Sequence, residues 1–170
     1  MDWIDEIARA WRREYPELDS SAMPPLVRLA RLAVLLERFQ RAVLEPFELS
    51  ASDYSVLAML RRAGKPYRAS PSLLVSRLQH SSGGLTKMLK RLEERGLVGR
   101  VPDPDDGRGL LVSLTPAGLR VQESVFNAFL AASNDLLGSL PRREKRDLDT
   151  LLRALLDRFE DYLGDGGSAE

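Results

Sequence analysis

Residues 81–115 read SSGGLTKMLKRLEERGLVGRVPDPDDGRGLLVSLT, and this stretch decides the fold that we predict for the chain. Its first part predicts an amphipathic helix, because apolar side chains recur at helical spacing along it. The apolar face consists of Leu85, Met88, Leu89 and Leu92. Thr86, Lys87 and Lys90 point away from that face. A helix that buries leucines and turns threonine and lysine outward is suited to lie in a DNA groove.

The beginning of this helix is unusual for a purely structural helix. Ser81 and Ser82 can cap its free backbone amides, yet Gly83 and Gly84 follow in the first turn. Each glycine there costs roughly 1 kcal/mol of helix stability relative to alanine. A close approach of a phosphate to the bare backbone at the helix N-terminus would explain both glycines.

A β-hairpin follows the helix, and a second short helix precedes it. Residues 97–101 and 110–114 predict two strands, and the connector 102–109 contains the turn-forming residues Asp, Pro and Gly. Residues 70–78 predict a helix joined to the 81–95 helix by a tight turn. Two short helices in this order, the second with outward basic residues, form a helix-turn-helix, and the hairpin is its wing.

The remaining chain is mostly helical. Apolar periodicity and capping residues predict helices over residues 2–14, 22–45, 50–63 and 115–140, with a last helix from the break at 139–141 to about residue 163. Residues 67–69 are too short for more than a minimal strand. The fold class is therefore mainly α with a small β-hairpin wing. The terminal helices carry more apolar surface than the winged-helix core can cover, and self-association is the simplest way to bury it. The alternative is packing within one chain onto the first long helix.

Composition narrows the class of partner. The chain has 170 residues and a formal net charge of zero. It has no cysteine, which excludes disulfides and thiolate metal sites and is typical of a cytoplasmic protein, so we expect that location. The charge is unevenly distributed, because residues 61–108 hold 11 Lys and Arg against 5 Asp and Glu. A basic middle between acidic flanks favours an anionic partner at that region, although a solvated surface of mixed charge is the alternative.

Motifs for catalysis, metal ions and membranes are absent from the sequence. It has one histidine, no GxSxG and no GxxxxGK, and no paired groups suggest acid–base chemistry. The aspartates of the hairpin loop lack the spacing of a calcium loop. No apolar run approaches the length of a membrane span, and the N-terminus does not have the pattern of a signal peptide. We expect no enzyme activity, no cofactor, no metal ion and no membrane partner.

Residues 49–118 resemble the winged-helix core of the MarR family of bacterial transcription regulators. The resemblance rests on LVSRLQHSSGGLTKMLKRLEERGLVGRVPDPDDGRGLLVSLTPAG, and the helical flanks are similar to the dimerisation region of that family. It implies a homodimer that binds a pseudo-palindromic double-stranded operator, with one recognition helix in each half-site and the wings beside them. It also implies three regions: N-terminal helices over 1–48, a winged helix-turn-helix over 49–115 and C-terminal dimerisation helices over 116–170.

The resemblance carries DNA contacts onto particular residues. On the recognition helix these are Ser82, Gly83, Gly84, Thr86, Lys87 and Lys90. At the wing tip, the Asp-x-Arg element of the family matches Asp106 and Arg108. Arg108 would enter the minor groove, and Asp106 would brace it. Many relatives have a second arginine where this chain has Gly107, so one phosphate contact is missing here.

The N-terminal extension resembles a branch of the family that includes urate-responsive and PecS-like regulators. In that branch a small-molecule effector binds between the dimerisation helices and the DNA-binding lobe. The signature positions of its pocket fall here on Trp11, Ser55, Met88 and Arg100. Ser55 and Met88 replace an aspartate and an arginine, so a neutral or more apolar aromatic effector fits better than urate. Trp11 as a packing residue and Arg100 as an ion-pair partner are the structural alternatives.

We therefore predict a dimeric winged-helix regulator, most simply a repressor, that a small effector releases from its operator. Two other functions use the same fold. The first is a module that binds a protein rather than DNA. The second is an architectural protein that binds DNA without sequence preference.

Overall fold

The structure is a computed structural model, and it describes residues 2–78, 81–104, 106 and 109–165. Contacts divide the chain into two compact units, residues 1–126 and 127–170, so that the boundary falls inside one long helix. The two units are described separately below. The three functional regions predicted from the sequence remain predictions.

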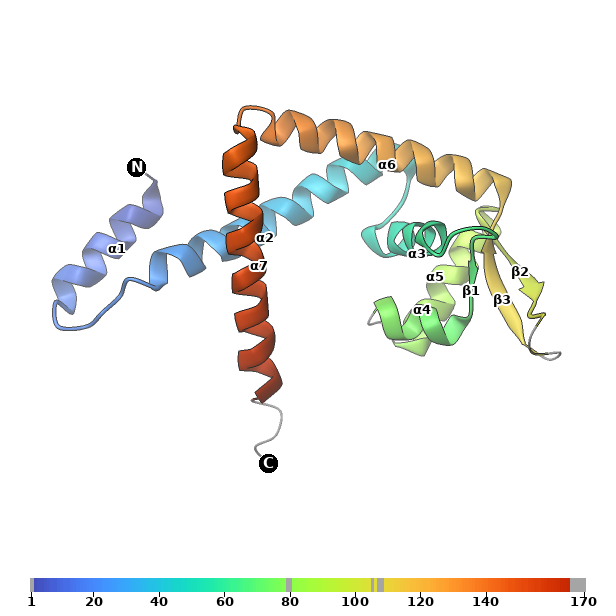
Figure 1. The fold of residues 1–170 in the computed structure, drawn as a ribbon, viewed down its shortest axis with the longest axis horizontal. Helices are drawn as coiled ribbons and strands as arrows, with labels where there is room; N and C mark the ends of the chain where they lie inside the picture. The colour runs from blue at the N-terminus through green and yellow to red at the C-terminus, as the bar shows by residue number, and fades with distance from the viewer. Residues whose placement is uncertain (1, 79–80, 105, 107–108, 166–170) are drawn as a thin grey trace. The chain divides into compact units, whose positions relative to one another are not determined.

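The first unit contains the N-terminal helices and the winged-helix lobe (Figure 1). Its helices are α1 (Trp3–Glu14), α2 (Met23–Leu44), the single turn η1 (Glu45–Phe47), α3 (Ala51–Arg62), α4 (Pro71–Leu78), α5 (Ser82–Glu94) and the first half of α6 (Pro116–Leu137). Its strands are β1 (Arg68–Ala69), β2 (Val98–Pro102) and β3 (Leu110–Leu114). The second unit contains the end of α6 and all of α7 (Arg142–Asp165). The predicted order of helices and strands is confirmed.

The wing is part of a three-stranded antiparallel sheet with the strand order β1-β3-β2. The predicted hairpin is present, with Arg100 opposite Val112 in the β2–β3 register. The two residues of β1 also pair with β3, Arg68 opposite Ser113. A two-residue strand has no period that a sequence pattern could reveal, so its partner is visible only in the fold.

The lobe has a compact apolar core made by α3, α4, α5 and the sheet. Its fully buried side chains include Val56, Leu57, Leu60, Leu74, Leu89, Leu92 and Val112. Tyr54 links α3 to α6 through a hydrogen bond with the buried Gln122. Burial raises the pKa of Tyr54, and the bond with Gln122 opposes that rise.

The beginning of α6 lies directly against the segment that precedes β2. A Cβ atom on Gly118 would lie 1.9 Å from the carbonyl oxygen of Leu97. Any side chain at this position would therefore force the backbone to move. Thr115 caps α6 here, because its Oγ1 accepts a bond from the amide of Gly118 at 3.0 Å. The same hydroxyl donates to the carbonyl oxygen of Gly96 at 2.6 Å. The LTPAG run therefore joins the wing to the following long helix.

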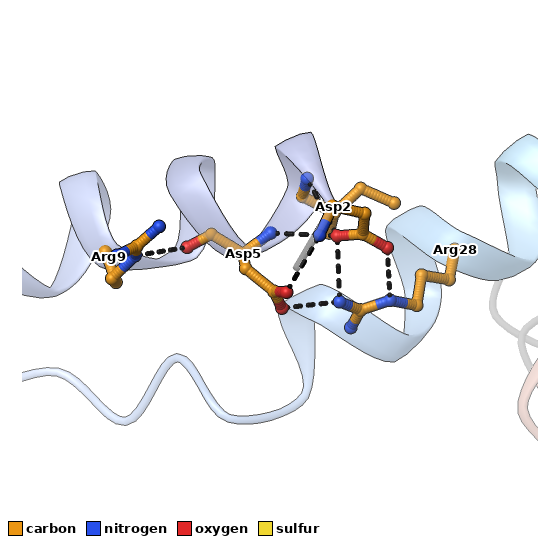
Figure 2. Close-up of polar contacts among 5 residues, drawn as sticks. Asp2, Asp5, Arg9 and Arg28 are labelled. Carbon is orange, nitrogen blue, oxygen red and sulfur yellow. Dashed lines mark hydrogen bonds and ion pairs between the residues drawn. The ribbon is translucent and has the colours of Figure 1, made fainter.

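Helix α1 is attached to α2 by an ion-pair cluster (Figure 2). Two side chains of α1, Ile4 and Ala8, are also buried. The guanidinium of Arg28 donates to both carboxylate oxygens of Asp2 at 3.0 Å and to Asp5 at 2.5 Å. These bonds hold the pKa values of Asp2 and Asp5 below their ordinary value. Asp2 also caps α1 in a reciprocal capping box with Asp5.

The long helices expose much apolar surface. In the first unit, exposed side chains on α2 include Leu26, Leu32, Val34, Leu35 and Leu36. In the second unit, those on the end of α6 and on α7 include Leu136, Leu151, Leu152, Leu156 and Leu163. None of the described residues of α7 is classed as buried. The surplus of apolar surface that the sequence indicated is therefore present in the single chain.

No described helix is both long enough and apolar enough to cross a bilayer.

Candidate DNA-binding interface

Helix α5 has one buried face and one exposed face, as predicted. Its buried residues are Leu85, Met88, Leu89 and Leu92. Thr86, Lys87 and Lys90 are exposed. The Nζ of Lys90 lies 3.9 Å from the carboxylate of Glu94, and both side chains are more than 60% exposed (76% and 63%). An ion pair that is long and solvated contributes little stability, so Lys90 can readily exchange Glu94 for a phosphate.

Ser81 is the residue that caps α5. Its Oγ accepts a hydrogen bond from the amide of Gly84 at 3.1 Å, and its carbonyl oxygen accepts from Leu85. Ser82 is the first helical residue, and its carbonyl oxygen accepts from the hydroxyl of Thr86 at 2.9 Å. Among the described residues, no hydrogen bond reaches the amides of Ser82 and Gly83, which are two of the first-turn amides that have no partner within a helix.

The two glycines of the first turn have different structural reasons. A Cβ on Gly84 would lie 3.1 Å from the Oγ of Ser81, so the small residue makes room for the helix cap. A Cβ on Gly83 would meet no atom of the chain within 4 Å. Packing within the chain therefore explains Gly84 and leaves Gly83 unexplained. A bare, exposed backbone at a helix N-terminus suits the close approach of an anion.

An ion pair joins α5 to α3. Nη2 of Arg91 donates to Oδ1 of Asp53 at 2.7 Å, and the Asp53 side chain on α3 is only 10% exposed. The other oxygen of Asp53 accepts from the hydroxyl of Ser50 at 2.7 Å, within the capping box at the beginning of α3. The cap is local in sequence. The bond to Arg91 could not be predicted, because Arg91 lies 38 residues away and no local pattern connects the two.

The wing tip is described only in part. The amide of Asp103 donates to the carbonyl oxygen of Gly109, and the amide of Gly109 donates to that of Asp106, both at 2.9 Å. Asp106 is exposed. Arg108 lies outside the described residues, as does Gly107, so the predicted bracing of Arg108 by Asp106 stays a prediction.

Three of the four predicted effector residues lie in the lobe. Met88 is only 4% exposed and packs in the core of the lobe. The hydroxyl of Ser55 donates to the carbonyl oxygen of Ala51 at 2.9 Å. Arg100 on β2 donates through Nε to Glu93 at 2.8 Å, which is the ion pair that the sequence left open as an alternative.

Trp11, the fourth predicted effector residue, lies on α1. Its ring stacks on Tyr15 with centroids 5.6 Å apart, and both side chains are exposed. Figure 1 shows α1 beside the N-terminal half of α2, away from α5 and the sheet. Within one chain, the helix that carries Trp11 therefore does not lie beside the elements that carry Met88 and Arg100.

Among residues 2–78, 81–104, 106 and 109–165, no group of three His, Asp or Glu side chains is placed to hold a metal ion.

Comparison with known proteins places this architecture in a family. A model described as MarR family matches residues 47–109. The HTH-type transcriptional regulator PecS of Dickeya dadantii is 36% identical over 160 residues, which are 94% of this chain and 94% of PecS. The chain belongs to the MarR family. The multiple antibiotic resistance protein MarR of Escherichia coli is 32% identical over 121 residues, 71% of this chain and 82% of that protein.

Solved structures agree with this assignment. A mutant MarR from E. coli in complex with operator DNA matches with a TM-score of 0.65 and 30% identity, over 82% of this chain and 99% of that one. AbsC from Streptomyces coelicolor, at 24% identity and a TM-score of 0.72, shares the fold. The predicted winged helix-turn-helix fold is confirmed, and so is the predicted class of protein, a DNA-binding transcriptional regulator.

Proposed function

We propose that this MarR-family regulator is a homodimer that represses transcription by binding a pseudo-palindromic operator. The observation that carries the proposal is the N-terminus of α5, where an exposed serine and an exposed glycine precede an exposed Thr-Lys face. Gly83 has open space around it, so its bare backbone serves a contact outside the chain. The operator complex of E. coli MarR, a relative with the same fold, supports DNA as that contact.

The residues of α5 divide into two groups by chemistry. The amides of Ser82 and Gly83 and the ammonium of Lys90 bind phosphates, which supply most of the affinity. Thr86 and Lys87 lie one turn further along the helix and reach base edges in the major groove. Gly84 acts through the cap, because the Ser81 hydroxyl occupies the space that a side chain would need.

The wing supplies a second contact in this proposal. Arg108 enters the narrow minor groove beside each half-site, where the negative potential attracts a guanidinium, and Asp106 braces it. Asp106 is exposed and lies at the tip of the loop between β2 and β3, a position from which such a contact is reachable.

The homodimer buries the apolar faces of the long helices. Exposed leucines on α2, at the end of α6 and on α7 recur at helical spacing, as expected for helices that pack on a second copy. Two recognition helices related by a twofold axis would then reach half-sites about 34 Å apart, one turn of DNA.

A small effector releases the dimer from DNA in this proposal. Arg100 is half-exposed and holds Glu93, so an anionic or strongly polar ligand group could replace that carboxylate. In this proposal Met88 supplies an apolar contact from the lobe, and Ser55 and Trp11 complete the proposed effector set, Trp11 from the N-terminal helices. Melting in the presence of urate and of uncharged phenols tests this part. We expect a rise in melting temperature with a phenol that is lost in Arg100→Ala; no rise with any of them removes the effector from the proposal.

Selection of DNA by the protein tests the central proposal. Full-length protein is mixed with sheared genomic DNA of its source, and the retained fragments are sequenced. We expect one or a few discrete promoter sites with inverted half-sites. A protein-binding module would retain no DNA, and an architectural protein would retain fragments without preference. The relatives are transcription regulators, and we propose no enzyme activity for this chain.

Two glycine substitutions make the test specific to α5. Gly83→Ala and Gly164→Ala both add a methyl group to a helix where nothing lies within 4 Å. Each should leave the fold intact or stabilise it, by up to about 1 kcal/mol. We expect only Gly83→Ala to weaken binding to the selected site, about tenfold or more, which corresponds to one lost phosphate contact. Equal affinities for the two variants would contradict a close DNA approach at Gly83.

A further inference from the structure

The C-terminal end of the recognition helix is bonded to the end of α2. Helix α5 ends at Glu94 with Arg95 as its C-cap residue, and Gly96 follows in the left-handed conformation at φ +65°. The side chain of Arg95 donates through Nη1 to the carbonyl oxygen of Glu48 at 2.6 Å and through Nη2 to that of Phe47 at 2.9 Å. Both acceptors lie in the short connection between α2 and α3. Arg95 thus connects the DNA-reading helix to the junction that leads into the long N-terminal helix.

The chemistry of this contact favours arginine. A guanidinium presents two parallel N–H donors in a rigid plane, and here they bind the carbonyls of two consecutive residues. Bonds from an ionised donor are about twice as strong as neutral ones. The carbonyls lie at the C-terminal end of the α2–η1 segment, where the helix dipole favours a positive charge. The Glu48 carboxylate is 3.9 Å away and 89% exposed, so it adds little.

The acceptor residue has an unfavourable backbone conformation. Glu48 has φ 53° and ψ 37°, in the left-handed region, which is unfavourable for a residue other than glycine. Such a conformation persists only where its surroundings fix it. Because Arg95 binds the carbonyls of Glu48 and of the residue before it, the arginine and the turn stabilise each other. The direction in which the chain leaves α2 for the lobe is therefore coupled to the position of α5.

A second bond joins the same end of α5 to the other long helix. The hydroxyl of Thr115 donates to the carbonyl oxygens of Gly96 at 2.6 Å and Leu97 at 3.2 Å, and it caps the beginning of α6. Residues 95–97 thus contact the end of α2 and the beginning of α6. These are the helices whose exposed apolar faces form the dimer in the function proposed above.

We infer that Arg95 is a positioning residue that sets the orientation of the recognition helix relative to α2, and through it the half-site spacing that the dimer accepts. This inference rests on the proposed function, since half-site spacing matters only for a dimer on DNA. One base pair added between half-sites moves one of them by about 3.4 Å and rotates it by about a tenth of a turn. A rigid connection at residue 95 makes the protein sensitive to such a change.

Duplexes with altered spacing test the inference. The operator selected from genomic DNA is synthesised with its natural centre and with one base pair added or removed, and affinities are measured for wild type and Arg95→Ala. We expect the affinity of wild type to be at least about tenfold lower for each altered duplex than for the natural one, a loss comparable to that from a mismatched base pair. We expect Arg95→Ala to bind the natural duplex more weakly than wild type does. Its affinity for the altered duplexes should be less than about threefold below its affinity for the natural one.

Two further variants separate positioning from other roles. Glu48→Gln removes the distant carboxylate and keeps both carbonyl acceptors, so we expect it to retain the wild-type dependence on spacing. Arg95→Lys keeps the charge without the planar pair of donors, so we expect an intermediate dependence. Equal weakening of Arg95→Ala on all three duplexes would make Arg95 a direct DNA contact or a stability residue and overturn the inference. Absence of selective binding by wild type would instead contradict the proposed function.

A distance measurement tests the inference without DNA, and also serves if Arg95→Ala is too unstable for titration. The chain has no cysteine, so Lys90→Cys places a single spin label on the exposed face of α5. Pulsed electron spin resonance on the dimer gives the distribution of distances between the two labels. We expect Arg95→Ala, or Arg95→Lys to a lesser degree, to broaden this distribution, and Glu48→Gln to leave it unchanged. An unchanged width in both arginine variants would overturn the inference.

Discussion

The winged-helix lobe and helix α7 are built from the same kind of sequence pattern, but the lobe buries apolar side chains within the chain and the described residues of α7 do not. In α5, four of 13 residues are buried, and α3 buries five of 12. In α7, 24 residues long, none of the described residues is classed as buried, and Leu151 is 69% exposed. An amphipathic pattern therefore predicts a helix with one apolar face. Whether that face is buried in the monomer depends on the packing partners that the rest of the chain provides.

The first prediction, with the largest effect, tests whether the exposed apolar face of α7 forms the dimer interface. Leu152→Glu combined with Leu156→Glu places two charges on the exposed apolar face of α7. We expect the dimer to dissociate, because a desolvated like-charged pair opposes association, and operator affinity to fall about 100-fold or more. Light scattering after gel filtration measures the oligomeric state.

The control for this substitution lies in the lobe. Leu73→Glu changes a comparably exposed leucine of α4, at 43% against 44% for Leu152. We expect this variant to remain dimeric. If both variants elute as dimers, the apolar face of α7 is not part of the interface.

The second prediction tests the tightly packed lobe. Gly118→Ala forces a methyl group against the carbonyl oxygen of Leu97, and the beginning of α6 must move away. We expect the free energy of unfolding to fall by about 2 kcal/mol, within the range for overpacked sites. Chemical denaturation followed by circular dichroism measures it, with Gly164→Ala as the control in open space. A loss that is equal in both variants would show that the close approach at Leu97 is unimportant.

The third prediction concerns the outward face of α5. Lys90→Ala removes an exposed positive charge whose ion pair with Glu94 is long and solvated. We expect affinity for the operator to fall about tenfold and the slope of log affinity against log salt to decrease by about 0.9, the value for one phosphate contact. Fluorescence anisotropy at several salt concentrations measures both quantities. Lys145→Ala on α7 should keep the wild-type slope, and the wild-type slope for Lys90→Ala would contradict a phosphate contact.

The smallest expected effect concerns the attachment of α1. Arg28→Ala removes the shared partner of Asp2 and Asp5, so α1 should exchange its amide hydrogens faster while the lobe keeps its protection. Because the pKa values of both carboxyls are lowered in the folded protein, their contribution is present above the usual pKa of 3.8 and is lost as the pH falls through the lowered values. Hydrogen exchange by mass spectrometry should therefore show a difference between the variants at pH 7 that disappears well below pH 3.8. Equal exchange of α1 in Arg28→Ala and wild type at pH 7 would instead assign the attachment to Ile4 and Ala8 alone.

Local signals in the sequence were sufficient for most of the fold. The capping box of Ser50 and Asp53, the glycine at 96 and the leucine spacing of α5 act over a few residues, so they can be read directly. The hairpin between β2 and β3 is local in the same way. The apolar excess on the long helices was also visible, since it depends only on periodicity.

The remaining features depend on contacts between distant residues. Asp53 bonds to Arg91 and the end of α2 bonds to Arg95, across 38 and more than 45 residues of sequence. Neither pair leaves a periodic trace. The two glycines of α5 look equivalent in sequence, and only the position of the Ser81 hydroxyl separates their roles. For the effector residues, Trp11 lies on α1, away from the lobe, so the sequence pattern alone did not describe a formed site.

Hydroxyl-radical footprinting on the selected promoter fragment tests the central claim most directly, because it shows where a dimer of recognition helices lies on DNA. We expect two protected half-sites whose centres are one helical turn apart, about 34 Å, with protected minor groove on the outer side of each. Gly83→Ala should lose both half-sites together at a protein concentration that protects them in wild type. Uniform protection along the fragment, or a single unpaired site, would contradict a dimeric regulator that reads DNA through α5.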